Sequence, residues 1–522
     1  MSTPVYITTP LYYVNAAPHI GHSYTEIAAD CLVRYHRLNG HEVFFLTGTD
    51  EHGEKIAQAA KASNMLPQAF VDQQSETFKR LWVLLEIDEH HFIRTTDADH
   101  QRIVQLALEQ LQPQLERGLY TFWYCVPCET QWALTDFADP KKPSCPTCQR
   151  AVEERTEEDF FLKLGVHQAW LREHISKTPT FIQPESRRNE ILALLENPLP
   201  DLCLTRPRDR VSWGIDVPFS HHHVTYVWFD ALLNYISALG WPDGERFHRY
   251  WEEAGAMHLI GKDILRHHAL YWPIILHALG VRPPKMIFAH GWWKIGEQKM
   301  SKSLGNIVDP FAIVGGLLKG QPYAADVYRY FLLREVPFGQ DGGFSEEAIL
   351  NRLQNDLAND LGNLVNRTLS MIERYSQGTI PPLGAIGCAV DDEPLRREAL
   401  ELGRRMDVLM QTFNFSEALM TVFHLISHAN RYIETQTPWE LAKTGQTARL
   451  QSVLAVLAEI LRIVGIVLEP FMPQVSEAIW QQLGLGSAPR RLADCTRWPG
   501  LTAGQPIGKR DVLFPRMDAG TR

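Results

Sequence analysis

The chain has 522 residues, a length that predicts two to four domains rather than one core. Hydrophobic residues make up 45% and charged residues 21%, which excludes a disordered chain and fits a water-soluble globular protein. The net charge of −10 argues against a protein that coats nucleic acid nonspecifically, but it leaves room for a nucleic-acid substrate held by local basic patches.

Targeting signals and cysteine usage indicate the compartment. The amino-terminal sequence MSTPVYITTP lacks the basic and apolar regions of a signal peptide, and no apolar run of membrane-spanning length is apparent. Four of the 8 cysteines lie in two close pairs and the others are scattered, which suits a reducing compartment better than a disulfide framework. We therefore expect a cytoplasmic protein without a membrane partner.

The first fifty residues predict a βαβ unit. Residues 5–8 (VYIT) are typical of a strand, residues 23–39 carry apolar side chains at helical spacing, and residues 43–46 (VFFL) form an apolar run typical of a buried parallel strand. The turn at residues 10–22 therefore follows a parallel strand. Open parallel sheets bind their ligands at this carboxyl edge.

This turn contains His19, Gly21 and His22 at the start of the predicted helix. Helix N–H groups and the helix dipole favour an anion here, Gly21 allows close approach to the backbone, and two histidines add side-chain donors. The combination predicts a site for nucleotide phosphates. Two neighbouring histidines are more often ordinary surface groups, so the turn alone does not decide between the two interpretations.

Residues 118–225 are rich in cysteine, proline and charge, and they are predicted to form an insertion between two βαβ regions. The pairs CVPC and CPTC are separated by sixteen residues, the spacing of two cysteine knuckles around one tetrahedral ion. Four thiolates favour a closed structural zinc site, with a redox pair or an iron–sulfur cluster as alternatives. We expect one Zn²⁺, which supports the fold, held by Cys125, Cys128, Cys145 and Cys148.

A second βαβ region follows the insertion. Residues 257–260 and 285–290 are predicted strands, and residues 264–278, after a GKD turn, are a predicted helix. KMSKSLGN, just downstream, makes a cationic loop in which Lys299 and Lys302 can reach phosphates. Two lysines three apart would by themselves be explained as a solvated loop.

From about residue 356 onward the chain is predicted to be helical, with apolar runs such as LQSVLAVLAEILRIVGIVLEPFM. The pattern weakens beyond about residue 487, and no internal repeat is present.

HIGH followed by KMSKS, each after a βαβ strand, is the signature pair of the class I aminoacyl-tRNA synthetases, which the chain resembles. It is similar in particular to the methionyl-tRNA synthetases. The similarity runs from YITTPLYYVNAAPHIGH through GTDEHG, YVWFDALLNY, GKDILRHHALYWP and HGWWKIGEQKMSKSLGN to NRYIETQTPW, and fades over the last thirty or so residues.

The resemblance implies an α/β fold, in which a Rossmann-like parallel-sheet catalytic domain with a zinc-containing insertion precedes an α-helical anticodon-binding domain. The two halves of the catalytic domain would occupy residues 1–117 and 226–304, on either side of the insertion at 118–225. A stem-contact linker would span 305–355 and the anticodon-binding domain 356–522.

The resemblance also implies a two-step reaction. The methionine carboxylate attacks the α-phosphate of ATP and releases pyrophosphate, and the methionyl group then passes to the terminal adenosine of initiator and elongator tRNA(Met). Catalysis would be mostly positioning and electrostatic stabilisation. The catalytic residues would be His19, His22, Lys299 and Lys302, and ATP, with Mg²⁺, would also contact Gly21, Gly261 and Asp263.

In the same way, Asp50 of GTDEHG would hold the α-ammonium group of methionine. The side-chain pocket would consist of Leu11, Tyr13, Trp228, Ala231, Tyr235, Ile264 and His268. A thioether suits an apolar, polarisable lining with aromatic edges. Without the resemblance, Trp228, Tyr235 and Ile264 are equally well explained as plain core residues.

For the tRNA, the resemblance implies that Asn363, Arg367 and Trp439 read the CAU anticodon. Asn363 and Arg367 are four residues apart and share a helix face, and the tryptophan offers a stacking surface. The plainer alternative is a surface helix and a core tryptophan.

Two kinds of alternative protein fit less well. The isoleucyl, valyl and leucyl enzymes carry a far larger editing insertion than residues 118–225, and the cysteinyl enzyme places zinc with mixed ligands in its active site. A zinc-ribbon nucleic-acid-binding protein with an inactive nucleotide fold would not require the intact histidines and lysines. We expect a methionine–tRNA ligase acting on ATP, L-methionine and tRNA(Met), and a monomer, because no appended carboxyl-terminal domain is apparent.

Overall fold

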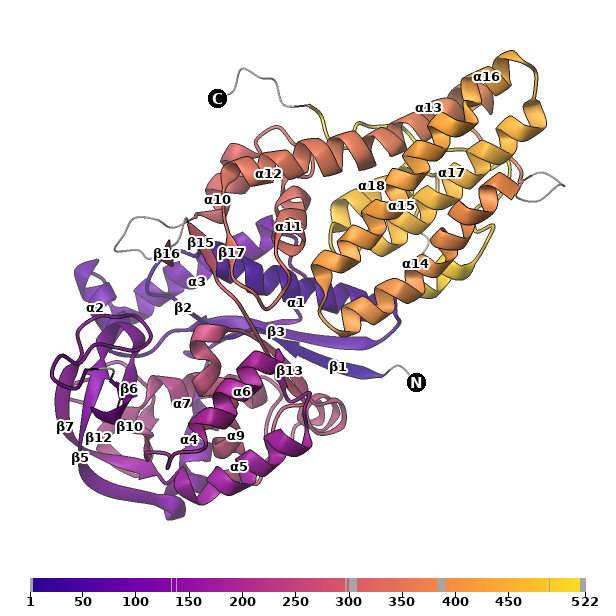
Figure 1. Ribbon diagram of the computed structural model, residues 1–522. Coiled ribbons are helices and arrows are strands. Elements are labelled where there is room, and N and C mark those ends of the chain that lie inside the picture. Colours follow the sequence, from indigo (N-terminus) through magenta and orange to yellow (C-terminus); the bar gives the residue numbers. More distant parts are fainter. Residues whose placement is uncertain are drawn as a thin grey trace. The chain divides into compact units, whose positions relative to one another are not determined.

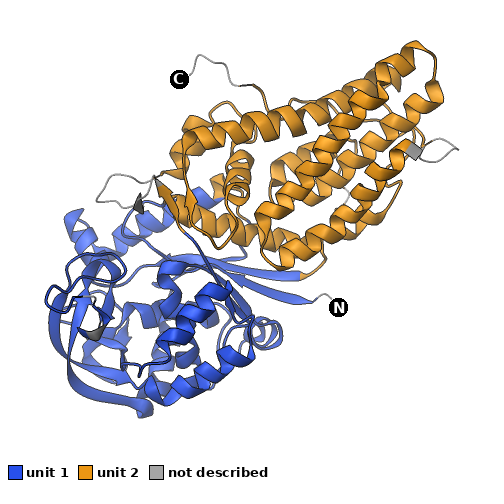
Figure 2. Cartoon of the chain, viewed as in Figure 1, with its two compact units in different colours: residues 1–18, 42–82, 88–291 blue, residues 19–41, 83–87, 292–522 orange. Residues whose placement is uncertain are grey.

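The structure is a computed structural model that describes residues 3–132, 134–137, 139–295, 298–299, 308–383, 390–487 and 489–516. The chain forms two compact units (Figure 2). Unit 1 comprises residues 1–18, 42–82 and 88–291, and unit 2 comprises residues 19–41, 83–87 and 292–522.

Unit 1 is built on a parallel sheet (Figure 1) with the strand order β2-β3-β1-β13-β14-β8, and β4 pairs with β3 outside this path. The strands are β1 (Pro4–Thr8), β2 (Tyr12–Tyr13), β3 (Glu42–Asp50), β4 (His91–Arg94), β8 (Ile182–Gln183), β13 (Ala256–Gly261) and β14 (Met286–His290). Every residue of β1 is buried, as is the VFFL run of β3. The predicted parallel α/β sheet is therefore confirmed.

Helices of unit 1 bury the apolar faces of this sheet in one continuous core that includes Tyr6, Leu46, Ile260, Trp272 and Ala289. They are α2 (Glu54–Ala62), α3 (Pro67–Leu84, whose last two residues belong to unit 2), α4 (Ala98–Leu111), α5 (Gly165–Lys177), α6 (Glu185–Leu194), α7 (Val227–Leu232), α8 (Asn234–Ser237) and α9 (Trp272–Ala278). The helix predicted over 264–278 is confirmed as a continuous helical segment over residues 265–278, in which a π-helical turn (His267–Tyr271) precedes α9. Pro273 has no amide proton, and it follows directly after this π-helical turn, where the regular hydrogen-bond ladder is already interrupted.

The predicted insertion contains two antiparallel sheets, and it also includes α5, α6 and β8, of which β8 joins the parallel sheet. One sheet has the order β6-β5-β7-β9, and a second has the order β10-β12-β11. Their bounds are β5 (Leu115–Cys125), β6 (Thr130–Trp132), β7 (Glu153–Leu162), β9 (Leu202–Cys203), β10 (Thr205–Pro207), β11 (Asp216–Val217) and β12 (Ser220–Thr225). The long β5–β7 ladder carries the first cysteine pair at its far end.

Unit 2 is mostly helical, which confirms the prediction for residues beyond 356. Its helices are α1 (Ile20–Leu38), α10 (Pro310–Ala312), α11 (Ala324–Glu335), α12 (Glu346–Arg352), α13 (Asn363–Tyr375), α14 (Glu393–Gln411), α15 (Phe415–Gln436), α16 (Pro438–Lys443), α17 (Thr447–Leu468) and α18 (Pro473–Gln482). A small sheet contains β15 (Trp293–Ile295), β16 (Gln298–Lys299) and β17 (Gly342–Gly343).

Helix α1 belongs to unit 2, although it was expected in the first half of the catalytic domain. Two contacts with α11 explain this grouping. The Ser23 hydroxyl lies 2.8 Å from the Tyr328 hydroxyl, and the buried Asp30 carboxylate pairs with the Arg329 guanidinium at 2.6 Å. Arg329 also donates to the main-chain carbonyl of Phe471, so one buried cation joins α1 to the loop before α18.

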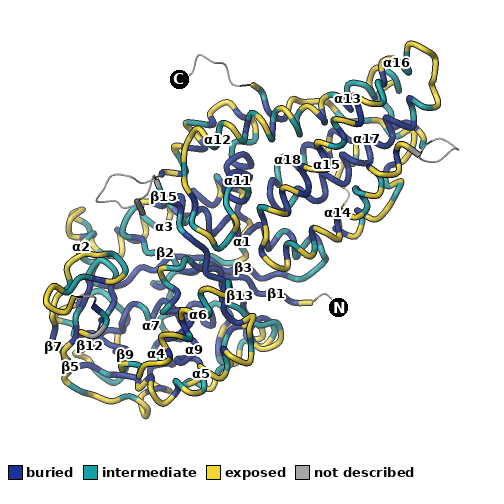
Figure 3. Tube along the Cα trace, viewed as in Figure 1, coloured by how far each residue is buried: buried dark blue, intermediate teal, exposed yellow. Residues whose placement is uncertain are grey.

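Helix α17 corrects one expectation from the sequence. Within the described residues it is the one helix long and apolar enough to cross a membrane, with a mean hydropathy of 2.0, whereas no such run was expected. Its apolar window is 89% buried, so α17 has the surroundings of a core helix (Figure 3).

Residues after α18 pack back onto unit 2. The Ile380 amide donates to the Gln505 carbonyl at 2.8 Å, and the Arg510 guanidinium donates to Asn366 of α13 at 2.8 Å. Long-range contacts of this kind leave no periodic pattern, which is why the sequence signal weakens there.

Candidate functional site

The histidines of the HIGH motif cap helix α1. The Gly21 amide donates to Nδ1 of His19, the N-cap residue, and the His19 amide donates to Nδ1 of His22, both at 3.1 Å. This is a capping box made from two imidazoles. Because each Nδ1 accepts a hydrogen bond, the proton of each neutral ring is on Nε2. Two N–H donors therefore accompany the positive end of a 19-residue helix.

Glycine at position 21 is required by the cap itself. The two imidazole rings stack with centroids 3.9 Å apart, and a Cβ atom on Gly21 would lie 2.9 Å from Cε1 of His19. The sequence predicted that Gly21 gives a ligand access to the backbone. In this structure the atom nearest to a Cβ position on Gly21 is Cε1 of the His19 ring.

The KMSKS motif is only partly described. Lys302 lies outside the described residues, and Lys299 ends β16, which pairs with β15. The carbonyl of Val308, five residues after the motif, accepts a hydrogen bond from the Ile20 amide at 3.1 Å. The carboxyl flank of KMSKS is therefore tied to the first turn of the HIGH helix, within unit 2.

Gly261 and Asp263, the predicted ribose contacts, lie at the carboxyl end of β13 in unit 1. Gly261 is paired in register with His290 of β14, so the GKD turn begins where two parallel strands end. A Cβ atom on Gly261 would lie 2.5 Å from the Asp263 carboxylate, so glycine is needed for the aspartate to fold back over this strand end.

The predicted methionine pocket assembles around His268. Its Nδ1 donates to the Ile264 carbonyl at 3.0 Å, and its Nε2 accepts from the Tyr235 hydroxyl at 2.8 Å. The Trp228 ring stands at 88° to the His268 ring, with centroids 6.5 Å apart. Burial lowers the pKa of His268 to about 4, so the imidazole is neutral at physiological pH.

The other pocket residues share the same apolar core. Tyr235 is buried inside it, whereas Leu11, Tyr13, Trp228 and Ile264 are partly exposed at its edge. Ala231 is buried on α7. Tyr235 thus lies within the core, and Trp228 and Ile264 pack against its edge.

Asp50 ends β3 and is 8% exposed. Burial, together with the nearby carboxylates of Asp230 and Glu129, raises the pKa of Asp50 well above its usual range. Its Oδ1 atom has no hydrogen-bond partner among the described atoms. A buried carboxylate oxygen without a partner is costly, so this position is suited to a cationic group supplied by a ligand.

Two features of this region were not recognised in the sequence. The His267 ring stacks on Trp228 with centroids 3.7 Å apart, and both lie in unit 1. Asp230 accepts from His52 and His100, each at 2.7 Å, and although burial opposes ionisation these histidines hold the pKa of Asp230 below its usual value. No motif signals this network, because its members are far apart in sequence.

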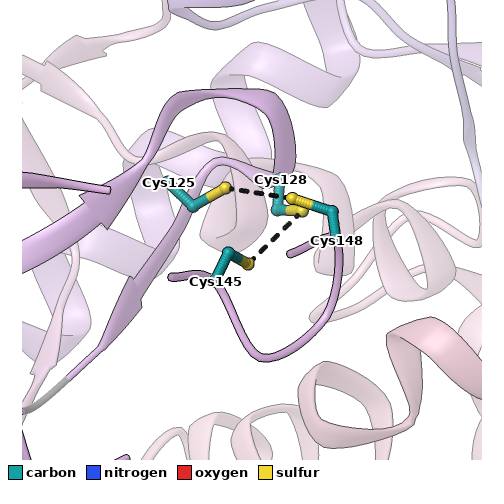
Figure 4. Close-up of side chains that lie close together, drawn as sticks. All are labelled: Cys125, Cys128, Cys145 and Cys148. Carbon is teal, nitrogen blue, oxygen red and sulfur yellow. Dashed lines mark hydrogen bonds between the residues drawn. The ribbon is translucent and has the colours of Figure 1, made fainter. Parts of the chain in front are cut away.

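The four cysteines of the knuckles converge (Figure 4), and their sulfur atoms all lie within 4.8 Å of one another. The Sγ atoms of Cys125 and Cys148 are 3.5 Å apart and those of Cys128 and Cys145 are 3.8 Å apart, and neither pair forms a disulfide. Four thiolates at about 2.3 Å around a tetrahedral ion lie about 3.8 Å from one another. The donor set therefore fits one metal ion and is consistent with zinc.

The predicted anticodon residues lie on two helices of unit 2. Asn363 is exposed at the start of α13, and Arg367 follows one turn later. The Arg367 guanidinium lies 6.0 Å from the centre of the Trp439 ring and pairs with Glu434 at 2.7 Å. Trp439 is 38% exposed on α16, so the alternative of a core tryptophan is wrong.

Comparisons with known proteins agree with these features. The family model described as tRNA synthetases class I (M) matches residues 5–153 and 128–369, and the model described as anticodon-binding domain of tRNA ligase matches residues 393–506.

Curated relatives match over almost the whole chain. The methionine–tRNA ligase of Caldanaerobacter subterraneus subsp. tengcongensis is 45% identical, covering 99% of this chain and 80% of the relative. The methionine–tRNA ligase of Bacillus subtilis is 41% identical, covering 98% of this chain and 78% of the relative.

Solved structures show the same fold. Mycobacterium tuberculosis methionyl-tRNA synthetase in complex with methionyl-adenylate matches with a TM-score of 0.93 at 39% identity, covering 98% of this chain and all of that chain. Its apo form matches with a TM-score of 0.85 at 36% identity, covering 99% of both chains. With these relatives and with its own parallel sheet, helical unit and four-cysteine cluster, the chain belongs to the methionine–tRNA ligases, class I aminoacyl-tRNA synthetases.

Proposed function

We propose that this methionine–tRNA ligase forms methionyl-adenylate and pyrophosphate from methionine and ATP, and then transfers the methionyl group to the terminal adenosine of initiator and elongator tRNA(Met). The observation that carries the substrate assignment is Asp50, a buried carboxylate with an unpartnered oxygen, in the unit that also holds the aromatic pocket. Methionine offers an ammonium group to Asp50 and an apolar thioether to the aromatic pocket.

The pocket has an apolar character despite its polar residues. The Tyr235 hydroxyl is committed to His268, and the Nδ1–H of His268 is committed to the Ile264 carbonyl. These groups satisfy one another and so present few donors to a ligand, which favours a thioether over a polar side chain. Trp228 adds an aromatic surface at the partly exposed edge. We propose that Leu11, Tyr13, Ala231 and Ile264 complete this lining.

The phosphate chemistry is proposed for the capped histidines and the KMSKS lysines. A methionine carboxylate oxygen attacks the α-phosphorus in line, and pyrophosphate leaves. His19 and His22 would donate from Nε2 to phosphate oxygens, with Gly21 leaving room for the His19 ring. Lys299 and Lys302 would neutralise the leaving pyrophosphate, and Mg²⁺ would accompany ATP as its counter-ion.

Gly261 and Asp263 would hold the ATP ribose, in keeping with their position at the carboxyl edge of the sheet. One Zn²⁺ would be bound by the cysteine cluster, where it stabilises the insertion.

For tRNA, we propose that Asn363, Arg367 and Trp439 read the CAU anticodon. Exposure of Trp439 beside the Arg367 guanidinium supports this, because an aromatic face and a cation together suit a stacked, unpaired base.

The domain limits suggested by the sequence also stand as a proposal. The catalytic domain would occupy 1–117 and 226–304, the insertion 118–225, the stem-contact linker 305–355 and the anticodon domain 356–522. A cytoplasmic monomer without a membrane partner is proposed with it, supported by the unpaired state of the seven described cysteines.

Pyrophosphate exchange measured with each of the twenty amino acids tests the function. Methionine is expected to drive exchange best, and exchange driven best by another amino acid would show that the substrate assignment is wrong. Lys302→Ala is expected to slow methionine-dependent exchange by orders of magnitude while changing ATP affinity less, because a loop lysine acts mainly on charge present in the transition state.

A further inference from the structure

The residue that follows the second cysteine, Glu129, faces inward from the metal knuckle. It has a φ of +48°, in the left-handed region that glutamate rarely adopts, and it is 4% exposed. The tight turn of the knuckle holds this conformation, since the Glu129 amide donates to the Val126 carbonyl at 3.2 Å.

Glu129 contacts the chain segment that follows Asp50. Its Oε1 accepts from the Lys55 amide at 3.1 Å. Gly53, which has a φ of +106°, leaves room for this contact, because a Cβ atom there would lie 2.7 Å from the Glu129 carboxylate and 2.8 Å from the Tyr13 hydroxyl. The Tyr13 hydroxyl donates to the His52 carbonyl at 3.1 Å, in the same loop.

A second contact reaches the segment before α7. The Glu129 carbonyl accepts from the Tyr226 hydroxyl at 2.5 Å, and Tyr226 is the N-cap residue of α7, the helix of Trp228 and Ala231. One knuckle residue therefore contacts two segments of the proposed methionine site.

Lys55 adds an independent connection between the knuckle and the pocket. Its Nζ donates to the Pro127 carbonyl at 3.0 Å, inside the CVPC turn, and lies 5.2 Å from the centre of the Tyr13 ring. Tyr13 is thus held between the His52 carbonyl and a lysine that is itself anchored to the knuckle.

We propose that Glu129 is a positioning residue for methionine: it holds Tyr13 and the loop after Asp50 in their binding positions, and the metal-bound knuckle sets methionine affinity through it. The inference rests on the methionine site proposed above. Removing the carboxylate leaves the Lys55 amide without its partner. The loop then relaxes together with its His52 carbonyl, which holds the Tyr13 hydroxyl, and the pocket loses its preformed shape. Because Glu129 does not touch the reacting phosphate, the loss falls on methionine binding more than on the chemical step.

The test compares Glu129→Ala with Glu154→Ala, the same substitution at an exposed glutamate of the same insertion. The dissociation constant for methionine is measured by calorimetry without ATP, and zinc content and ATP affinity are measured on the same preparations. Glu129→Ala is expected to weaken methionine binding by about tenfold to a hundredfold, the effect of removing a charged hydrogen-bond partner. Zinc content and ATP affinity stay near those of the unmodified enzyme. In exchange assays, KM for methionine rises by more than kcat falls, whereas Glu154→Ala changes neither.

Equal methionine affinity in the unmodified enzyme and in zinc-loaded Glu129→Ala would overturn the proposal. If the alanine variant loses its metal, Glu129→Leu decides the question, because leucine keeps a bulky side chain at this position but removes the acceptor for the Lys55 amide. A rise of about threefold or more in the dissociation constant of zinc-loaded Glu129→Leu supports the proposal, and an unchanged constant overturns it. An unmodified enzyme that binds another amino acid in place of methionine would instead contradict the proposed function.

Discussion

At the scale of single residues, the two histidines of HIGH have two tasks, and these can be separated. Their Nδ1 atoms cap α1, and we propose that their Nε2 protons donate to the phosphates of ATP. Asparagine is among the best N-cap residues, but its side chain is too short to place a donor where Nε2 is.

His19→Asn should therefore keep the stability of α1 and slow methionine-dependent pyrophosphate exchange by about a hundredfold to a thousandfold, the usual effect of losing one oxyanion donor. The thermal midpoint of the same preparation serves as the control. Unchanged exchange would assign His19 to capping alone.

A second residue-scale prediction concerns pH. Burial lowers the pKa of His268 to about 4, from an ordinary value near 6.5. Between about pH 4 and pH 6.5 the His268 imidazole is protonated in the unfolded chain but neutral in the folded chain. The free energy of unfolding therefore rises with pH across this interval. The contribution of neutral His268 to the free energy of unfolding is fully present above about pH 7. It is lost as the pH falls through 6.5 toward 4, and the loss amounts to about 3 kcal/mol.

Denaturant unfolding between pH 4 and pH 8 measures this effect. The free energy of unfolding should fall with acidification in the unmodified protein and fall less steeply in His268→Asn. Equal slopes would show that His268 is not the group that titrates.

At the scale of elements, the metal knuckle depends on a single cluster of four cysteine ligands. Cys145→Ser should reduce zinc affinity by more than about a hundredfold, because a direct ligand matters more than the outer contacts that typically contribute ten- to a hundredfold. Limited proteolysis within residues 118–225 should then accelerate, since the turns that carry the ligands loosen.

Cys203→Ser is the matched control for that measurement, because Cys203 is buried in the same insertion outside the cluster. It should keep one zinc per chain. Iron with visible absorbance, or no metal in the unmodified protein, would disprove the zinc assignment.

Helix α1 shows how much of the site depends on the placement of elements. Its amino end carries the histidines proposed to bind phosphate, its Ile20 amide donates to the Val308 carbonyl after KMSKS, and its middle is anchored to Arg329. The 3.6-residue period predicts the helix but not these partners, since they come from segments about three hundred residues away.

At the scale of the whole molecule, activation and tRNA charging make different demands on the chain. Methionine activation requires no tRNA, so Trp439→Ala should leave pyrophosphate exchange nearly unchanged. Loss of one stacking platform costs about 1–3 kcal/mol per base, enough to lower aminoacylation of tRNA(Met) by one to two orders of magnitude.

Both assays on one preparation, with Met420→Ala as a control at another exposed apolar residue of unit 2, check this prediction. Asn363→Ala should behave like Trp439→Ala. Equal losses in both assays would mean that Trp439 acts on folding rather than on the anticodon.

Several features of this protein follow from the sequence by itself. The apolar runs at residues 5–8 and 43–46 became buried parallel strands, the two cysteine pairs converged, and the helical pattern after residue 356 was confirmed. These outcomes are predictable because each depends on residues close together in the chain, whose periodicity and chemistry persist in any compact fold.

Only the tertiary structure decided the rest. Four features have no sequence signature: the unpartnered oxygen of Asp50, the exposure of Trp439, the burial of α17 and the contacts of Glu129 with Lys55 and Tyr226. Each joins or separates segments that are distant in the chain, so its geometry is fixed by how whole elements pack. A local sequence pattern shows which face of a segment is apolar. It does not show which other segment packs against that face, because this choice depends on the packing free energy of the complete core.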